Sequence, residues 1–413
     1  SGARDATAIK RYMRMLYDKA GSDPLLMPRY LLLFGDGSFN NISLSYNNQN
    51  WIPTYQTEDA IDPSKSYTSD DYFGLLDIGE GEYTGDIVDI GIGRLCVSDA
   101  QQAQEVVSKL LGYDSYRLLS STGDNCSATG DGGIADWRTH VLFVSDDQEG
   151  DGFEGIIHMN QSDFLAQRVE NEHPYLNVDK IYLDAYQQVS TPGGERYPQA
   201  NADLREKVQK GLLVVNYVGH GGEVGWAHER LLDNGIIQGW SNKDRLPLFM
   251  TATCEFSRWD DPSRTSAGEL VLLNPNGGGI GLMTTTRLAY SSQNFSLAQY
   301  FYDHAFADTD EQGRTARLGD MSRRTKRDIS TAQPTLRNHR NFSLLGDPSL
   351  RLALPKHTLR ITTITDTLGN AVDTLKALAT VRISGFVDDG SGQPMVDFNG
   401  VVMPTVYDKV QAQ

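Results

Sequence analysis

The sequence predicts an α/β fold, in which a mainly parallel sheet is flanked by helices, followed by a β-rich segment. Short apolar runs without polar alternation are typical of strands that are buried on both faces of a parallel sheet. Segments with helical periodicity separate these runs up to about residue 355, as expected for strands joined by helical crossovers. From about residue 356 the helical signals stop, and short β-type runs alternate with Gly/Asp/Ser turns.

The individual elements follow from these patterns. Strands are predicted at 30–34, 87–97, 140–145, 180–186, 212–218, 246–253 and 278–286. The first helix, 5–19, has Ile9, Met13 and Leu16 on one side. Residues 98–101 (Ser-Asp-Ala-Gln) are predicted to form a capping box at the start of the next helix. Further helices are predicted near 162–172, 201–210, 266–273, 295–306 and 321–329.

The same patterns divide the chain into three parts. Residues 1–120 form a first α/β subdomain, and a Gly/Ser/Asp-rich loop opens a second one, 121–355. Residues 356–413 contain three predicted strands, at 358–366, 379–389 and 401–409. Their spacing suits an immunoglobulin-like sandwich, but the segment is shorter than the roughly 100 residues of a complete one. The predicted sandwich is therefore either truncated or unusually small.

Composition limits the classes of partner and of site. The 413 residues carry 54 acidic and 37 basic side chains, a net charge of −17, which argues against nucleic acid or an anionic membrane as a partner. Three widely spaced cysteines, Cys96, Cys126 and Cys254, form neither a disulfide framework nor a CxxC metal site. No apolar stretch approaches the length of a membrane helix, and no N-terminal signal peptide is recognisable.

The most informative residues stand at the ends of two predicted strands. The run 212–218 ends in Gly-His-Gly-Gly, with the histidine at position 220, and the run 246–253 ends at Cys254. Loops at the carboxyl ends of parallel strands are where open α/β sheets place their chemistry. A half-exposed thiol near a histidine has a lowered pKa and acts as a nucleophile. The glycines beside His220 let backbone N–H groups approach a carbonyl, as an oxyanion hole requires.

A structural explanation for both residues is the alternative. A free cysteine is usually buried and behaves as a small hydrophobic side chain. Glycines after a strand are common turn residues. The appearance of both residues at matching strand ends favours the catalytic interpretation of His220 and Cys254.

Longer motifs around these residues resemble the gingipain-type cysteine peptidases, which have a caspase-like fold. The motifs are YVGHGGEVGWAHE, TATCEF, GGGIGLMTTTRLAYSS and LLGDPSLRL, and the resemblance extends over about residues 29–354. Within that family the chain looks most like the C-terminal signal peptidases, or sortases, of the type IX secretion system. The resemblance implies a caspase-like sheet in two subdomains and matches His220 and Cys254 to the family's catalytic pair.

Further site residues are implied by the same resemblance. Asp147, the second residue after the predicted strand 140–145, matches or adjoins the acid that supports the histidine, and Asp146 and Glu149 are equal alternatives. Backbone N–H groups of Gly221 and Cys254 are expected to bind the oxyanion. The residues expected to contact substrate are Thr285, Thr286, Arg287, Tyr290 and Trp226. For Trp226 packing is the alternative, and for the others a polar strand-end loop. No residue matches a pocket for arginine or lysine cleanly.

The function implied is a cysteine endopeptidase that removes the C-terminal signal domain of cargo proteins through a thioester. Water, or an amine of an anchoring lipopolysaccharide, would resolve the thioester. The alternatives are a freely secreted gingipain-like protease and a catalytically silent surface scaffold. The expected partners are cargo proteins and other secretion components, and the expected location is the cell surface.

No cofactor is required by this chemistry, and the identity of any bound metal is left open. Acidic clusters at 70–71, 80–86 and 260–261 are of the type that holds Ca²⁺, because hard cations take oxygen ligands. None has the spacing of a twelve-residue calcium loop, and solvated surface is the alternative.

Overall fold

The computed structural model describes residues 5–41, 50–58, 61–119, 136–147, 156–307, 314–355, 358–388 and 391–398. The chain divides into two compact units, one of residues 1–116 and 137–353 and the other of residues 117–136 and 354–413. The α-helices are α1 (Ala6–Ala20), α2 (Ala100–Leu119), α3 (Ile157–Glu172), α4 (Pro198–Lys210), α5 (Asn234–Gln238), α6 (Ala267–Leu273), α7 (Ser291–Ala305), α8 (Leu318–Ala332) and α9 (Asn338–Asn341). Short 3₁₀ helices are η1 (Asp70–Gly74), η2 (Asp136–Thr139) and η3 (Leu183–Ala185).

The first unit is built on one eight-stranded sheet with the order β1-β2-β13-β12-β11-β7-β3-β4. Its strands are β1 (Tyr30–Phe34), β2 (Gly91–Leu95), β3 (His140–Ser145), β4 (Asn177–Tyr182), β7 (Val214–Val218), β11 (Leu248–Ala252), β12 (Gly281–Thr285) and β13 (Phe342–Leu345). All neighbours are parallel except β12 and β13, which pair antiparallel. The mainly parallel sheet predicted from the sequence is confirmed.

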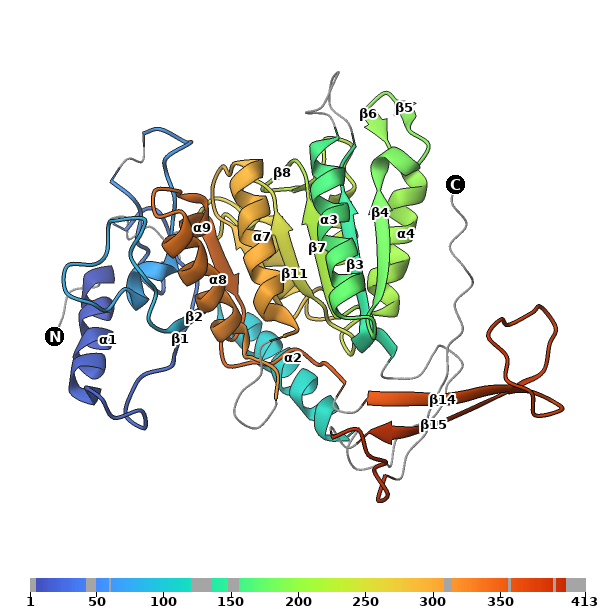
Figure 1. The fold of residues 1–413 in the computed structure, drawn as a ribbon. Coiled ribbons are helices and arrows are strands. Elements are labelled where there is room, and N and C mark those ends of the chain that lie inside the picture. The colour runs from blue at the N-terminus through green and yellow to red at the C-terminus, as the bar shows by residue number, and fades with distance from the viewer. Residues whose placement is uncertain are drawn as a thin grey trace. The chain divides into compact units, whose positions relative to one another are not determined.

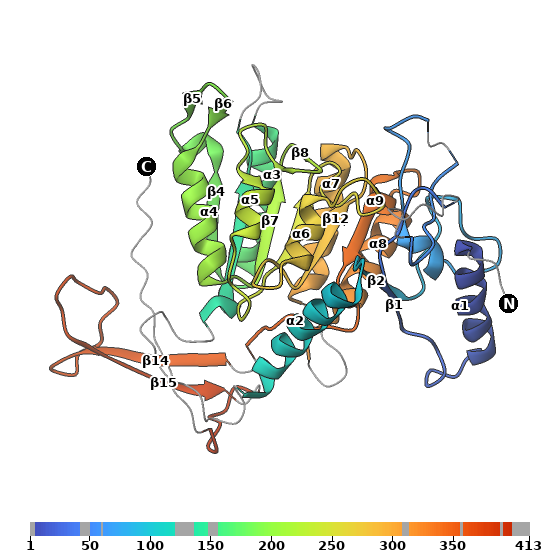
Figure 2. The same cartoon turned by 180° about the vertical axis from the view of Figure 1, so that it is seen from behind.

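Helices cover both faces of this sheet. Figure 1 shows α3, α7 and α8 on one face, and Figure 2 shows α4, α5 and α6 on the other. Because both faces are covered, β3, β7 and β11 are buried almost throughout, which explains why their sequences lack polar alternation. A core cluster packs these strands against α4, α5 and α6, with Leu142, Val215, Phe249, Leu204 and Val271 among its members.

The first unit also contains smaller sheets. A three-stranded sheet is formed by β8 (Gly221–Gly222), β9 (Gly225–Trp226) and β10 (Leu232–Asp233). It follows β7 directly, so the predicted Gly-His-Gly-Gly loop continues into a short hairpin. A separate hairpin is formed by β5 (Val189–Thr191) and β6 (Gly194–Arg196).

Helix capping follows local sequence, with one shift from the prediction. The side chain of Asp99 accepts from the backbone N–H of Gln102 at 2.9 Å, and the Gln102 side chain accepts from Ser98 N–H at 2.9 Å. Asp99 is therefore the residue that caps α2, one residue later than predicted, and the Gln102 side chain reaches back past it to Ser98. Both Asp and Ser can act as caps, so the sequence allowed either register. At α6 the box is formed by Ser266 and Glu269.

The two predicted α/β subdomains share one sheet. Strand β13 was not predicted, and it joins them, because it pairs with β12 on one side and with β2 on the other. The second unit contains the antiparallel pair β14 (Thr358–Asp366) and β15 (Val381–Asp388). The third predicted strand, 401–409, lies outside the described residues, so the immunoglobulin-like assignment stays a prediction. Within the described ranges, no helix is long and apolar enough to cross a membrane.

Candidate active site at the ends of β7 and β11

The pairing of two strands brings His220 and Cys254 to the same edge of the sheet. Strands β7 and β11 are parallel neighbours, and Val218 pairs with Ala252. His220 and Cys254 each lie two residues beyond that pair. Neighbouring strands are about 4.8 Å apart, so an equal offset from a paired position places both residues in adjacent loops. The register of β7 and β11 therefore explains why the two strand ends lie side by side, as expected from the sequence.

Close packing joins the two loops. A Cβ built on Gly221 would lie 2.6 Å from the hydroxyl oxygen of Thr253, the residue before Cys254. The backbone carbonyl of Glu223 accepts from Ala267 N–H at 2.7 Å, and its carboxylate accepts from Arg258 at 2.7 Å. The segment after His220 is therefore tied to the segment after Cys254 by contact, by a backbone hydrogen bond and by an ion pair.

Two of the three glycines around His220 are required by close approach. None of Gly219, Gly221 and Gly222 has a positive φ. A Cβ on Gly219 would lie 2.6 Å from the carboxyl carbon of Asp146, whereas a Cβ on Gly222 would meet nothing within 4 Å. Gly219 and Gly221 thus leave room for neighbouring groups of the site, whereas Gly222 has no close neighbour that would exclude a side chain.

The Cys254 thiol is half-buried and forms hydrogen bonds with the backbone of Ala289. Its Sγ accepts from the N–H of Ala289 at 3.4 Å and lies 3.5 Å from the Ala289 carbonyl, to which the S–H can donate. Burial raises the pKa of the Cys254 thiol, the Ala289 N–H lowers it, and Glu255 raises it further. The net shift is upward, in contrast to the lowered pKa expected from the sequence. The resting thiol is therefore protonated at neutral pH and needs a base.

The residue after the nucleophile candidate has an unusual backbone. Glu255 has φ of 50°, in the left-handed region that non-glycine residues rarely adopt. Its N–H donates to the carbonyl of Arg287 at 3.1 Å, and Ser257 N–H donates to Thr285 at 3.0 Å. These two bonds hold the turn after β11 against the end of β12. Such local strain is stored most often at functional sites.

The backbone of His220 is held by three hydrogen bonds. Its N–H donates to Asp146 Oδ2 at 2.5 Å, and its carbonyl accepts from the Tyr217 hydroxyl at 2.6 Å and from Ala227 N–H at 2.9 Å. Asp146 follows β3, the strand on the other side of β7. Burial raises the pKa of the Tyr217 hydroxyl, and the charge of Asp146 raises it further, so the hydroxyl stays a donor. The side chain of His220 is exposed.

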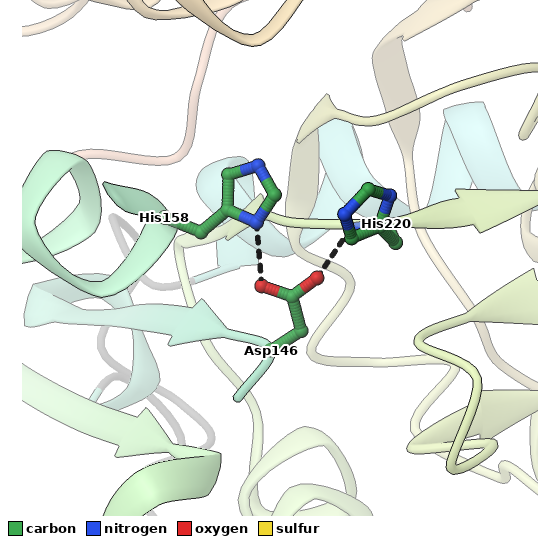
Figure 3. Close-up of side chains that lie close together, drawn as sticks. All are labelled: Asp146, His158 and His220. Carbon is green, nitrogen blue, oxygen red and sulfur yellow. Dashed lines mark hydrogen bonds and ion pairs between the residues drawn. The ribbon is translucent and has the colours of Figure 1, made fainter. Parts of the chain in front are cut away.

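Two more histidines surround His220. His158, in the first turn of α3, contacts Asp146 Oδ1 through Nδ1 at 2.8 Å. The rings of His158 and His220 lie edge to face with centroids 5.0 Å apart, and the His228 ring stacks on His220 at 5.7 Å. Figure 3 shows His158 and His220 on either side of the buried Asp146 carboxylate.

Asp147, the acid favoured by the sequence, has other partners. Its Oδ2 accepts from the Tyr197 hydroxyl at 2.7 Å and from Gln188 at 3.3 Å. Its Oδ1 is buried and has no hydrogen-bond partner among the described residues. Asp146, one of the open alternatives, contacts the His220 backbone and His158 instead. The other alternative, Glu149, lies outside the described residues.

Three of the residues expected to contact substrate are buried and hold loops. The Thr285 hydroxyl donates to the carbonyl of Thr253, and the Thr286 hydroxyl donates to that of Thr68 at 2.9 Å. Arg287 forms a two-bond ion pair with Asp260. Neither threonine is exposed, and only 8% of Arg287 is. These side chains therefore hold the loops around Cys254 together, and they present little surface to a substrate.

The remaining two expected substrate residues differ from one another. Trp226 is fully buried, and its ring stacks on Tyr217 at 4.3 Å and packs against Phe256. Trp226 is therefore a packing residue, which was the alternative, because an indole between two aromatic rings is stabilised by its burial. Tyr290 is 50% exposed and directly follows Ala289, which contacts the Cys254 thiol. It keeps its place as a substrate-contact candidate.

Most of the acidic residues considered for Ca²⁺ have cationic or backbone partners. Asp70 forms two bonds with Arg94, and Asp71 lies between Lys326 and Arg340. Glu80 and Asp86 accept from backbone N–H groups of 77, 87 and 81. Along the described parts of the chain, the group that could hold a metal ion is instead Asp146, His158 and His220. Sequence reasoning missed this grouping, because the sequence of residues 148–155, which separates Asp147 from the segment of His158, has no recognisable pattern.

Replacing Gly219 by alanine is expected to lower kcat/KM at least about tenfold. The new Cβ would overlap the Asp146 carboxyl group and the Tyr217 hydroxyl, and a displacement of about 1 Å at a catalytic residue can cost about 100-fold. Gly222→Ala is the matched control, since its Cβ would enter open space. Equal kinetics of the two variants in a peptide cleavage assay would contradict the prediction.

Comparison with known proteins agrees with this architecture. A model of a family described as peptidase family C25 matches residues 1–353. The crystal structure of the Arg-specific cysteine proteinase gingipain R (RgpB) aligns with a TM-score of 0.60 at 16% identity, covering 87% of this chain and 71% of that chain. The complex of the pro- and mature domains of RgpB from Porphyromonas gingivalis gives a TM-score of 0.61 at 16% identity, over 87% and 73%. These likenesses show a shared fold.

A further structural match is weaker. Dimeric latent PorU from Porphyromonas gingivalis aligns at 21% identity over 94% of this chain and 30% of that chain, and its TM-score of 0.43 is too low to support an argument. A search among curated proteins found no match. The family model covers most of the chain, and the fold is that of RgpB. The chain therefore belongs to peptidase family C25, the gingipain family of cysteine peptidases.

Proposed function

We propose that the protein is a cysteine endopeptidase in which Cys254 is the nucleophile and His220 the proton carrier. One observation supports this pairing above the others. The Val218–Ala252 register gives His220 and Cys254 equal offsets on neighbouring strands, and Gly221 packs on Thr253 between them. Membership in a cysteine peptidase family supplies the reaction class.

The proposed chemistry begins with the protonated thiol. Because burial raises the pKa of Cys254, His220 takes the thiol proton as the sulfur attacks the scissile carbonyl carbon. Backbone N–H groups of Gly221 and Cys254 would bind the negative charge on the carbonyl oxygen. His220 then returns the proton to the leaving amine, the C–N bond breaks, and a thioester remains. Water or an amine attacks the thioester and releases the thiol.

The supporting acid in this proposal is Asp146, with Asp147 as the alternative. Asp146 holds the backbone N–H of His220 at 2.5 Å and is only 2% exposed. A buried carboxylate beside the histidine stabilises the imidazolium that forms during proton transfer. The Asp147 carboxylate keeps one buried oxygen without a partner among the described residues, so it can also accept a hydrogen bond.

Substitution distinguishes the two acids. Asp146→Asn is expected to lower kcat/KM by about 10²–10⁴-fold, the range for loss of an acid that orients a histidine. Asp147→Asn is expected to cost less than tenfold, because its contacts are with Tyr197 and Gln188. Both variants keep the side-chain volume, so they serve as controls for each other. A larger loss for Asp147→Asn would exchange the two roles.

The proposed substrate is the junction between a cargo protein and its C-terminal secretion signal, processed at the cell surface with type IX secretion components. This assignment rests on the sequence motifs around His220, Cys254 and the LLGDPSLRL segment. A lipopolysaccharide amine is the proposed acceptor when the thioester is transferred. The acidic net charge of −17 is compatible with a protein partner.

The deciding experiment uses a cargo protein that carries its C-terminal signal domain, with and without an amine acceptor. The native chain is expected to cleave the junction and to form an adduct when the amine is present. Cys254→Ala is expected to do neither. Cleavage that persists in Cys254→Ala would disprove the mechanism. Cleavage of casein but not of the cargo would favour a freely secreted protease, and inactivity toward both would favour a silent scaffold.

Alkylation of Cys254 by iodoacetamide is expected to rise steeply with pH. Its raised pKa means that the reactive thiolate accumulates only as the pH passes above the ordinary thiol value of about 8.5–9. Cys96 serves as an internal control, because it is fully buried and its pKa is also raised. Mass spectrometry after brief labelling from pH 6 to pH 10 measures both sites. A labelling rate for Cys254 that is constant across this range would contradict the prediction.

A further inference from the structure

We propose that Asp146, His158 and His220 form a zinc site that switches the peptidase off. The inhibition depends on the proposed function, but the binding of the ion does not. One ligand atom from each of the three side chains can be chosen so that all lie within 4.8 Å of one another. The three residues come from different elements: the end of β3, the first turn of α3 and the loop after β7.

Two of the ligands already lie near the spacing that one ion requires. Zinc binds histidine nitrogen at about 2.0 Å and carboxylate oxygen at about 2.0–2.2 Å. Two ligands of one tetrahedral zinc ion therefore lie about 3.3–3.5 Å apart. His158 Nδ1 and Asp146 Oδ1 are 2.8 Å apart. A nitrogen of the exposed His220 ring lies within 4.8 Å of a ligand atom of each of the other two residues, so a small movement of this ring completes the set.

The surroundings of the three ligands also suit a cation. The Asp146 carboxylate is 2% exposed, and a desolvated carboxylate attracts a cation more strongly than a hydrated one. Its second oxygen is held by His220 N–H at 2.5 Å, which is the kind of outer hydrogen bond that orients a metal ligand. The side chain of His158 is 13% exposed, and His220 is exposed. An ion can therefore reach the site from solvent on the His220 side.

The donor set selects the class of ion. Two imidazoles and one carboxylate suit zinc and similar transition metals, whereas Ca²⁺ and Mg²⁺ prefer oxygen ligands only. Three protein ligands leave a fourth position of a tetrahedral ion for water. Once His220 binds zinc, its nitrogen can neither take the Cys254 proton nor return it. Zinc would therefore inhibit the enzyme reversibly, and a chelator would restore activity.

Binding is tested in the full chain with the Cys254→Ala substitution, which separates the ion from catalysis. Competition with a zinc-sensitive dye is expected to give one Zn²⁺ per chain. His158→Ala is expected to weaken binding at least about tenfold, since even outer-shell changes cost 10–100-fold. Thermal unfolding with added zinc gives a second readout, because a ligand that binds only the folded state raises Tm. His158→Gln replaces His158→Ala if the latter does not fold.

A second histidine–aspartate pair provides the matched control. His304 Nε2 and Asp328 Oδ2 are also 2.8 Å apart, but within the described residues no third ligand completes that pair. His304→Ala is expected to bind zinc as tightly as its parent. Equal affinity for the His158→Ala and His304→Ala chains would overturn the proposal. Loss of the ion in Cys254→Ala compared with the unmodified chain would overturn it too, because the site would then require the thiolate.

Inhibition is measured separately in the chain that retains Cys254. Micromolar zinc is expected to reduce peptide cleavage, and the inhibitory concentration is expected to rise at least about tenfold in His158→Ala but not in His304→Ala. Unchanged inhibition in His158→Ala would show that zinc acts elsewhere. If no substrate is ever cleaved, the proposed function fails, and the dye competition still decides the zinc site.

Discussion

Replacing Cys254 by alanine is expected to lower kcat/KM for peptide cleavage by at least about 10³-fold, to the level of the background. The sulfur forms the only covalent bond to substrate in the proposed mechanism, and removing a nucleophile in other peptidases costs about 10⁶ in kcat. Single-turnover cleavage of a chromogenic peptide measures the effect. Cys126→Ala is the control for general thiol loss, and equal losses in both variants would contradict the assignment.

His220→Ala is expected to cause a loss of similar size. The raised pKa of the Cys254 thiol leaves it protonated at neutral pH, so a missing base cannot be replaced by a pre-formed thiolate. Groups that act as one unit give non-additive losses. The double variant is therefore expected to be no slower than either single variant. Additive losses would show that the two side chains act independently.

The second large effect concerns the buried ion pair between Asp260 and Arg287. Asp260→Ala is expected to lower the free energy of unfolding by about 3–5 kcal/mol, because it leaves the Arg287 charge buried without its partner. Asp260 is fully buried, Arg287 is 8% exposed, and the guanidinium makes two bonds to the carboxylate. Asp260 also accepts from Thr68 at 2.6 Å and from Gln56 at 3.2 Å. Urea unfolding measures the change.

An exposed pair provides the control for the Asp260 substitution. Arg14 and Asp18 are one helical turn apart in α1, with 28% and 59% of their side chains exposed. Asp18→Ala is expected to cost less than about 1 kcal/mol. Replacing both Asp260 and Arg287 by leucine removes both charges together and is expected to recover much of the loss. Equal effects of Asp260→Ala and Asp18→Ala would contradict the assigned role.

Because of the same ion pair, we expect the folded protein to lose stability in acid. Burial raises the pKa of Asp260, but the hydrogen bonds and charge of Arg287 outweigh it, with Thr68 and Gln56 adding to them, so the net pKa is lowered. A carboxyl group whose pKa is lowered on folding contributes its full stability above its unfolded pKa, about 3.9, and loses it as the pH falls through the folded value. Unfolding below about pH 4 should therefore be less pH-dependent in Asp260→Ala.

Much of the fold was accessible from local pattern. Strands buried on both faces have continuous apolar sequences, which is why β3, β7 and β11 were predicted close to their observed bounds. Strand β13 was missed because its four residues, Phe342–Leu345, follow a short helical turn and pair antiparallel to β12. A strand of four residues carries too little periodicity to be separated from a loop. Its pairing makes one sheet of the two predicted subdomains.

The site shows the same division between local and non-local information. His220 and Cys254 were identified because each follows a recognisable strand, and their offsets from the Val218–Ala252 pair are equal. The burial of Thr285, Thr286 and Trp226 was not predictable, because exposure depends on elements far away in the sequence. Thr286, for example, is covered by a carbonyl of Thr68, 218 residues earlier in the chain.

The sequence by itself determined the α/β class, the order of most strands along the chain and the identity of the cysteine and histidine, since each depends on short-range pattern. Only the tertiary structure decided which acid adjoins His220, whether the Cys254 pKa is raised or lowered, and that His158 joins the site. The physical reason is that pKa values and contacts depend on burial and on neighbours from distant segments, here β3, α3 and the Ala289 loop. No spacing along the chain contains that information.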